Sequence, residues 1–308
     1  MRIVSLLPSA TEILYAVGAG DDVVGVTFEC DEPIHARETA AIVSTSSLPM
    51  ARDGYQPTPA EIDAAVSEKL AAGEDLYHLD RDALLQLNAD LIVTQDLCAV
   101  CAVDVSEVHD ALDFLGCTAE VLTTDPHTVE EILASIERIG AQTGHTQGAT
   151  DLVASLRERL AALPGAPTNN AARVAVLEWS DPPFAPGHWV PEMVEIAGAL
   201  SVIGDAGEKS VRTTWDAIVA SRPEIIVVAP CGFELPTSVA LTEELLAGKL
   251  GTILDRWDGE GPQVWAVDAN ASYARPGPRI VDGIEALAAI SDPTTFGQPD
   301  PVIAKRCR

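Results

Sequence analysis

Short apolar runs of strand length alternate with amphipathic helical patterns along most of the chain. The runs consist mainly of Val, Ile and Leu, and most are followed by a turn signal and then by apolar residues at helical spacing. They occupy residues 2–7, 23–26, 91–93, 119–122, 174–177, 225–229 and 263–267. Because strands that alternate with helices typically form parallel sheets, the pattern predicts an α/β protein with mostly parallel sheets.

One helical pattern in the middle of the chain is much longer than the others. It covers residues 127–163 and is interrupted only by Gly140, Gly144 and Gly148. Pro164, Gly165 and Pro167 end it, since proline and glycine break helices. We therefore predict one long helix between two α/β lobes. The predicted organisation is an N-terminal lobe (1–124), a connecting helix (125–165), a C-terminal lobe (172–290) and a poorly ordered tail (291–308).

Cysteine, acidic and aromatic residues follow several of the predicted strands. In open parallel sheets, ligands bind outside the carboxyl ends of the strands, where the loops converge. We therefore expect a ligand cleft lined from these positions. The residues that follow the strands are Glu29, Cys30, Cys98, Cys101, Glu178, Trp179 and Cys231.

Four of these residues are cysteines, which allows two interpretations. Cys98 and Cys101 have the C-x-x-C spacing that lets two thiolates ligate one metal or form a redox pair. Together with Cys30 and Cys231 they would make a site for zinc or iron. Equally, free cysteine is among the most frequently buried residue types, and all four would then be small core residues.

A proline-rich loop after residue 177 carries further candidates. Prolines in this loop prevent ladder hydrogen bonding, so we expect His188 and Trp189 to face outward together with Glu178 and Trp179. Aromatic rings suit a flat, partly apolar ligand, and an imidazole can bind a metal centre. Tyr273 and Arg275 would add a ring and an anion contact near a helix start. The alternative is that the aromatic residues pack in the core.

The charge of the chain excludes some partners. It has 19 basic and 47 acidic residues, a net charge of −28, and this argues against nucleic acid and anionic membranes because like charges repel. The acidic, lysine-poor composition is typical of proteins adapted to high salt. No apolar run is long enough to span a membrane, so we expect no membrane insertion. The first residues lack an export signal, from which we expect a cytoplasmic location.

The ends of the chain resemble a known family. The stretch SLLPSATEILYAVGAGDDVVGVT near the start, the long helical pattern, and RPGPRIVDGIEALA near the end are similar to the helical-backbone (class III) solute-binding proteins of ABC transporters. Their domain is named for iron chelates and vitamin B12. The resemblance covers roughly residues 2–290 and is closest to a cobalamin-binding-like cytoplasmic subgroup.

The resemblance implies a function as well as a fold. It implies two α/β lobes joined by one long helix, with a cobalamin-like corrinoid or another metal chelate held between them, and an ABC-transporter permease as a possible partner. The absent export signal, the insertion at residues 55–80 and the CAVC sequence depart from the family pattern. The alternative is a cytoplasmic metal- or thiol-dependent enzyme, or a metal-trafficking protein, that uses Cys98 and Cys101. Hydrolase, metalloprotease and nucleotide-binding motifs are lacking in the sequence.

Overall fold

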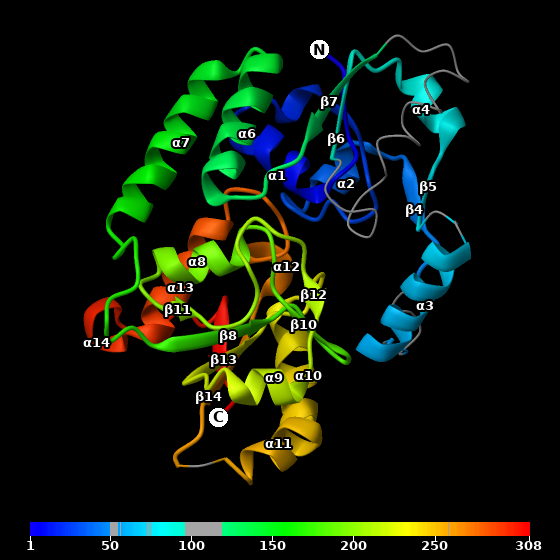
Figure 1. Cartoon of the computed structure of the whole chain (residues 1–308). Helices are drawn as coiled ribbons and strands as arrows, with labels where there is room; N and C mark the ends of the chain where they lie inside the picture. Colours follow the sequence, from blue (N-terminus) through cyan, green and yellow to red (C-terminus); the bar gives the residue numbers. More distant parts are fainter. Residues whose placement is uncertain (50–54, 56, 73, 75, 96–118, 258) are drawn as a thin grey trace. The chain divides into compact units, whose positions relative to one another are not determined.

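The computed structural model describes residues 1–49, 55, 57–72, 74, 76–95, 119–257 and 259–308 (Figure 1). These residues form two compact units. The first unit contains residues 1–126 and 130–155, and the second contains residues 127–129 and 156–308. Both units are built on a mainly parallel sheet, which confirms the predicted α/β class.

The sheet of the first unit is entirely parallel, and its first strand lies in the middle. The strand order is β3 (Ala41–Ile42), β2 (Val23–Val26), β1 (Ile3–Ser5), β6 (Leu91–Gln95), β7 (Glu120–Thr124). The chain first adds strands on one side of β1 and later returns to add β6 on the other side. The carboxyl ends of β1 and β6 therefore form the topological switch point at which open α/β sheets bind ligands.

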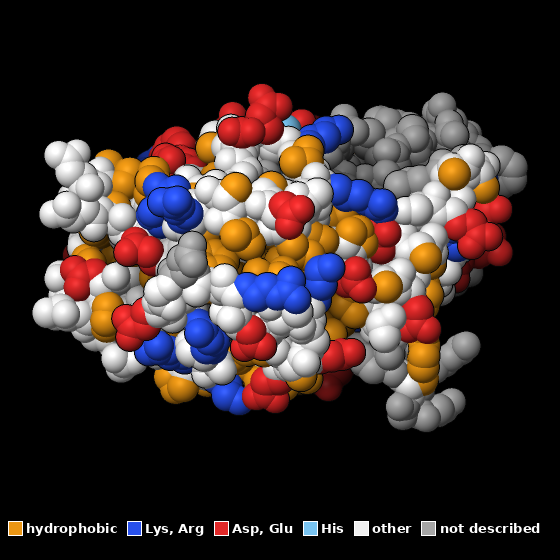
Figure 2. Space-filling model, turned by 60° about the horizontal axis from the view of Figure 1, so that its bottom comes forward, with side chains coloured by type: hydrophobic (Ala, Val, Ile, Leu, Met, Phe, Trp, Pro, Cys, Tyr) orange, Lys and Arg blue, Asp and Glu red, His pale blue; other side chains and the backbone are white. Residues whose placement is uncertain are grey.

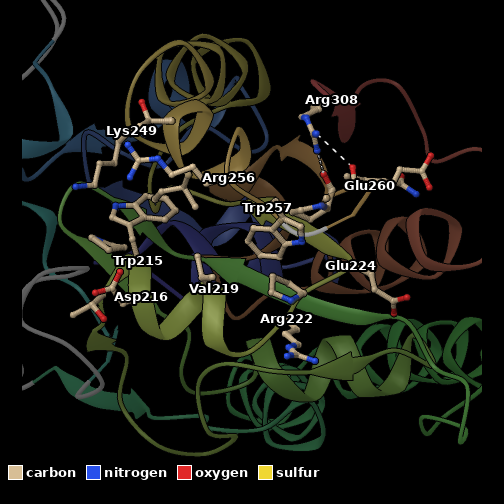
Figure 3. Close-up of a pocket in the computed structure, with 18 of the residues that line it drawn as sticks. Trp215, Asp216, Val219, Arg222, Glu224, Lys249, Arg256, Trp257, Glu260 and Arg308 are labelled. Carbon is tan, nitrogen blue, oxygen red and sulfur yellow. Dashed lines mark hydrogen bonds between the residues drawn. The ribbon is translucent and has the colours of Figure 1, made fainter.

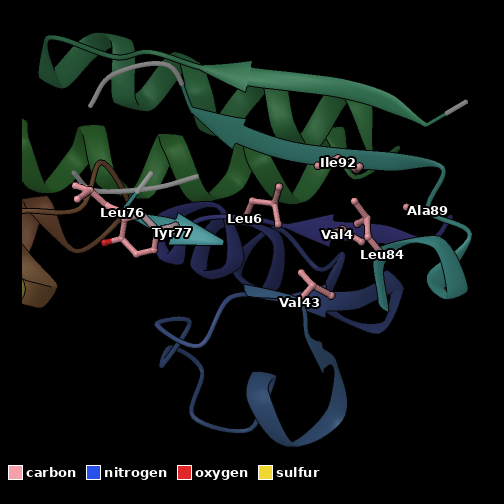
Figure 4. Close-up of a cluster of buried hydrophobic side chains, with 8 residues drawn as sticks. All are labelled: Val4, Leu6, Val43, Leu76, Tyr77, Leu84, Ala89 and Ile92. Atoms are coloured by element: carbon pink, nitrogen blue, oxygen red, sulfur yellow. The ribbon is translucent and has the colours of Figure 1, made fainter. Parts of the chain in front are cut away.

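Helices and a two-stranded antiparallel pair accompany this sheet. The helices are α1 (Pro8–Ala16), the 3₁₀ turn η1 (Gly20–Asp22), α2 (Ala36–Thr39), α3 (Pro59–Ala72) and α4 (Arg81–Leu87), and the antiparallel pair is β4 (Ser44–Ser46) with β5 (Tyr77–Leu79). A core of buried side chains holds the antiparallel pair and α4 to the sheet. Figure 4 shows its members, which are Val4, Leu6, Val43, Leu76, Tyr77, Leu84, Ala89 and Ile92.

The middle of the chain forms two helices where we predicted one. They are α6 (Val129–Gln142) and α7 (Thr146–Ala161). Gly144 lies between them with φ +77°, a left-handed conformation that ends a helix and that glycine adopts without strain. The two helices approach closely, because a Cβ atom on Gly140 would lie 2.3 Å from the Cβ of Ala149. The chain passes from the first unit to the second within α7.

The sheet of the second unit has four parallel strands and one antiparallel edge strand. The order is β11 (Leu200–Ser201), β8 (Arg173–Leu177), β13 (Ile225–Val228), β14 (Gln263–Val267), β15 (Ala304–Arg306). We expected a poorly ordered tail after residue 290, but the structure forms α14 (Pro293–Phe296) and β15 there. Only Ala304 of β15 is buried, so the sequence offers almost no apolar pattern from which to predict this strand.

The remaining elements of the second unit surround this sheet. The helices are α8 (Val190–Ile196), α9 (Trp215–Ala220), α10 (Leu235–Ala247), α11 (Lys249–Leu254), α12 (Ala269–Ser272) and α13 (Ile280–Ser291), and a small antiparallel sheet contains β9 (Trp179–Ser180), β10 (Pro183–Ala185) and β12 (Val211–Arg212). Among the described helices, none combines the length and apolar character needed to cross a bilayer.

Arg159 links α7 to α13 through two acidic side chains. Its guanidinium binds both carboxylate oxygens of Glu285, at 2.9 and 2.6 Å, and lies 2.5 Å from Asp282. The hydrogen bonds to Glu285 raise the pKa of Arg159 above its ordinary value. The arginine side chain remains 35% exposed, so solvent screens this network.

Replacing Arg159 with methionine should therefore lower the free energy of unfolding of the second unit by only about 1 kcal/mol, because the lost ion pairs are partly solvated. Urea denaturation at low salt measures the loss. In about 1 M NaCl the difference between variant and parent should shrink, since salt screens exposed charges. A salt-independent loss would mean that the methylene stem of Arg159, and not its charge, stabilises the contact.

Candidate functional site

The carboxyl ends of β8 and β13 form the topological switch point of the second unit. After β8 the chain places β11 on one side and later returns to place β13 on the other. Two backbone hydrogen bonds join the segments that follow these strands: Ala229 donates to Leu177 at 2.9 Å and Cys231 donates to Glu178 at 3.1 Å. We call Glu178, Trp179, Cys231 and Phe233 the C-terminal rim. The sequence predicted three of these residues, and the sheet brings them together.

An aromatic pair dominates the C-terminal rim. The ring centroids of Trp179 and Phe233 lie 5.9 Å apart with a tilt of 37° between the rings. Phe233 is 9% exposed, whereas Trp179 is half-buried. Phe233 is a rim residue that sequence reasoning missed as a ligand contact, although its position directly after β13 and Cys231 was a usable signal.

Glu178 positions the proline-rich loop. Its carboxylate accepts a hydrogen bond from the backbone N–H of Gly187 at 3.3 Å and another from the hydroxyl of Ser210. The loop passes very close to its neighbour, since a Cβ atom on Gly187 would lie 2.4 Å from the carbonyl oxygen of Glu208. Only glycine fits this crossing. The predicted ligand residue Glu178 therefore fixes the backbone that carries His188.

His188 lies beside a second histidine. The imidazole rings of His188 and His127 have centroids 5.5 Å apart, and Nδ1 of His127 is 3.1 Å from the carbonyl oxygen of Gly207. His188 has φ +51° and is held on both sides by backbone hydrogen bonds, to Glu208 at 2.6 Å and from Gly207 at 2.8 Å. No pattern in the sequence indicated this pair, because nothing in the spacing of the two histidines connects His127 to His188.

Trp189 and Tyr273 lie in the core of the second unit. Trp189 is 4% exposed, and its indole N–H donates to the backbone carbonyl of Tyr273 at 2.8 Å. The hydroxyl of Tyr273 donates to the carbonyl of Gly283 at 3.4 Å, and burial raises the pKa of Tyr273 above its ordinary value. Arg275 is also buried. We expected Trp189 to face outward, but it stands at the residue before α8 and its ring is buried.

In the first unit, Glu29 and Cys30 follow β2 as expected. Cys30 is fully buried, and its sulfur lies 3.0 Å from the hydroxyl of Thr11 and 3.1 Å from that of Thr27. Glu29 accepts a hydrogen bond from the hydroxyl of Tyr77 at 3.5 Å. A thiol enclosed by hydroxyl groups matches the interpretation of Cys30 as a core residue.

The other predicted metal ligands are not brought to Cys30 in the part of the chain that the structure describes. Cys231 is exposed and belongs to the second unit. Cys98 and Cys101 lie outside the described residues. Within the described ranges, no group of three or more His, Cys, Asp or Glu side chains is arranged to hold a metal ion. Zinc or iron at these cysteines has no support from the described residues.

The sequence of the chain is similar to those of known solute-binding proteins. No family model matches the chain. The chain is 23% identical over 292 residues to the vitamin B12-binding protein of Vibrio cholerae, covering 92% of this chain and 86% of that protein. It is 27% identical over 308 residues to the uncharacterized ABC transporter substrate-binding lipoprotein YvrC of Bacillus subtilis, covering 96% of this chain and 81% of YvrC.

A solved structure agrees with these relatives. The periplasmic heme-binding protein of Pseudomonas aeruginosa superposes with a TM-score of 0.67 at 20% identity, over 98% of this chain and 96% of that one. The chain is similar in sequence to these two binding proteins and has the fold of the class III solute-binding proteins. This confirms the resemblance found in the sequence. The class III relatives named here are binding proteins by name, and none of them is named as an enzyme.

The expected cytoplasmic location is wrong, because it is contradicted by the names of the similar proteins. YvrC is named as a lipoprotein, and the heme-binding protein is named as periplasmic. The expectation rested only on the lack of an export signal in the first residues of the sequence. The lack of an export signal in these residues does not outweigh the lipoprotein and periplasmic names of the similar proteins.

Proposed function

We propose that the protein is a solute-binding protein that holds a cobalamin-like corrinoid or another metal chelate, without catalytic turnover, and delivers it to an ABC-transporter permease. The relatives support this function, because one is named for vitamin B12, one for heme and one for ABC transport. The observation on this chain that carries the proposal is the half-buried Trp179 ring packed against Phe233, at the switch point of the second unit.

The C-terminal rim suits a flat conjugated ligand. A flat ring system that stacks on an indole face buries apolar surface that water would otherwise contact. Fixing the tryptophan side chain in one conformation costs little entropy. Trp179 is already held in place by Phe233, so binding needs no further ordering of this side chain. We propose that Trp179 makes the main ring contact.

His188 is the second proposed contact. Its backbone is fixed by the hydrogen bonds to Glu208 and from Gly207, and the loop that carries it is tied to Glu178 through Gly187. Imidazole nitrogen binds either a polar group of a chelate or its metal. Glu29 and Arg275 stay proposed ligand contacts of lower priority, since Glu29 already bonds Tyr77 and Arg275 is buried.

Equilibrium dialysis with two probes, cyanocobalamin and haemin, tests the proposal. The parent chain should bind at least one of them with a dissociation constant of about 1 μM or lower. Trp179→Ala should weaken that binding about 10- to 100-fold, because a stacked ring contact is lost.

Phe296→Ala is the matched control. Phe296 is also a half-buried aromatic residue of the second unit, but it ends α14 and is not a rim residue. Binding in the control should equal that of the parent. If neither probe binds at about 100 μM, the chelate-binding function is wrong, and if both variants lose affinity equally, the C-terminal rim is not the contact.

A further inference from the structure

A large hollow lies along α9 and α11 of the second unit and reaches the amino ends of β13 and β14. Its volume is about 1520 Å³, and its walls come from α9, α11, the segment before β14 and the last residues of the chain from Arg306 (Figure 3). Glu224 directly precedes β13 and Gln263 begins β14, whereas Pro183 of β10 and Thr213 extend the lining to the small antiparallel sheet; none of the four rim residues lines the hollow. The proposed function makes no use of it.

Basic side chains outnumber acidic ones in the lining of the hollow, although the whole chain is strongly acidic. The whole sequence has 19 basic and 47 acidic residues, whereas the hollow is lined by five basic and three acidic side chains. The basic residues are Arg222, Lys249, Arg256, Arg306 and Arg308, and the acidic residues are Asp216, Glu224 and Glu260. Figure 2, which turns the bottom of Figure 1 forward, shows Lys and Arg side chains around an apolar floor. Such a concentration of positive charge favours the binding of anions in the hollow.

Three of the five cations are available to a ligand. Arg308 donates to the carbonyl oxygens of Pro262 and Glu260, and Arg306 donates to the carbonyl of Arg308, so these two build the wall. Arg222, Lys249 and Arg256 are exposed, and in the described part of the chain none of these three side chains forms an ion pair.

Two indole rings line the same hollow. Trp215 and Trp257 are half-buried, and one side of each packs against the core cluster that includes Ile218, Leu250 and Leu254. In Figure 3, Trp215 lies with Lys249 and Arg256, and Trp257 lies toward Arg308 and Glu260. The hollow thus presents ring surface beside positive charge, a combination that binds aromatic anions.

We propose that this hollow is a second binding site, for a planar aromatic molecule that carries a phosphate or carboxylate group. The volume exceeds what an inorganic ion fills and is larger than the roughly 300–1,000 Å³ of a typical small-molecule site, so it has room for an organic molecule. The indoles would contact the ring of the ligand, and Lys249 and Arg256 its anionic group. Two sources share this chemistry, namely nucleotides and aryl carboxylates.

Equilibrium dialysis with four probes tests the second site. AMP and 2-naphthoate carry both ring and charge, adenosine carries the ring alone, and inorganic phosphate carries the charge alone. The site predicts that AMP, 2-naphthoate or both bind about tenfold more tightly than adenosine and phosphate, because two kinds of contact act together. Tighter binding of AMP would identify the ligand class as nucleotides, and tighter binding of 2-naphthoate would identify it as aryl carboxylates.

The variant Lys249→Ala/Arg256→Ala should weaken the tighter probe about tenfold or more, because it removes two charge contacts. Its control is Arg138→Ala/Arg157→Ala, which removes the same charge from exposed positions on α6 and α7 and should leave binding unchanged. Equal affinity for all four probes, or equal effects of the two double variants, would overturn the site. Unchanged cyanocobalamin binding and an unchanged melting curve in the double variant separate this outcome from a failure of the C-terminal rim.

Discussion

Replacing Trp189 with alanine is expected to lower the free energy of unfolding of the second unit by about 3–5 kcal/mol, the usual cost of truncating a buried tryptophan. The ring is 4% exposed and its N–H donates to the carbonyl of Tyr273 at 2.8 Å. The variant therefore leaves a cavity and removes the hydrogen-bond donor of a buried carbonyl.

Urea denaturation followed by tryptophan fluorescence measures this loss selectively. All five tryptophans of the sequence lie in the second unit, so their emission reports that unit. Trp189→Phe keeps most of the ring and should lose clearly less stability than the alanine variant. Trp179→Ala, at the half-buried rim position, is the matched control and should also lose less. Equal denaturation midpoints for Trp189→Ala and the parent would show that Trp189 is not a core residue.

The second large effect concerns Gly148 on α7. Glycine to alanine in a helix normally stabilises a protein by up to about 1 kcal/mol. Here the sign should reverse, because the added Cβ atom would lie 2.1 Å from the carbonyl oxygen of Val17, just after α1. Backbone cannot give way as a side chain does, so we expect Gly148→Ala to destabilise the first unit by about 3 kcal/mol.

Hydrogen exchange on peptides from α1 and α7 is the measurement for Gly148→Ala, with circular dichroism for the overall melting temperature. Exchange should accelerate in both helices and not in β13 or β14 of the second unit. Ala154→Ser, at an exposed position of the same helix, is the control and should change little. A melting temperature equal to or above that of the parent would refute the close approach of α7 to Val17.

The sequence predicted the strands well because their apolar runs are strong. Residues 23–26, 91–93, 174–177 and 225–229 all lie in or directly beside strands of the two sheets. The same reasoning predicted that Glu178 and Cys231 would meet, since parallel strands end at one edge. It did not predict where Trp189 points, because prolines restrict the backbone but say nothing about which side a ring faces.

Other features depend on long-range contacts that leave no local pattern. His127 and His188 come together only through the fold of the second unit. The break between α6 and α7 depends on the left-handed conformation of Gly144, whereas Gly140 and Gly148 lie within helices and serve as points of close approach. The three glycines of this helical pattern therefore have two different roles: Gly144 ends a helix, whereas Gly140 and Gly148 allow close approach of a neighbour. The sequence composition alone does not distinguish these roles.

The different surroundings of Cys30 and Cys231 have a practical consequence. Cys30 is enclosed by threonine hydroxyls, whereas Cys231 is exposed on the C-terminal rim two residues before Phe233. A maleimide dye would react with an exposed thiol and leave an enclosed one untouched. In a chain whose Cys98, Cys101, Cys117 and Cys307 are replaced by serine, a polarity-sensitive dye on Cys231 would label the C-terminal rim alone. A change in the emission of this dye on adding a chelate would then report directly on the proposed binding at the rim.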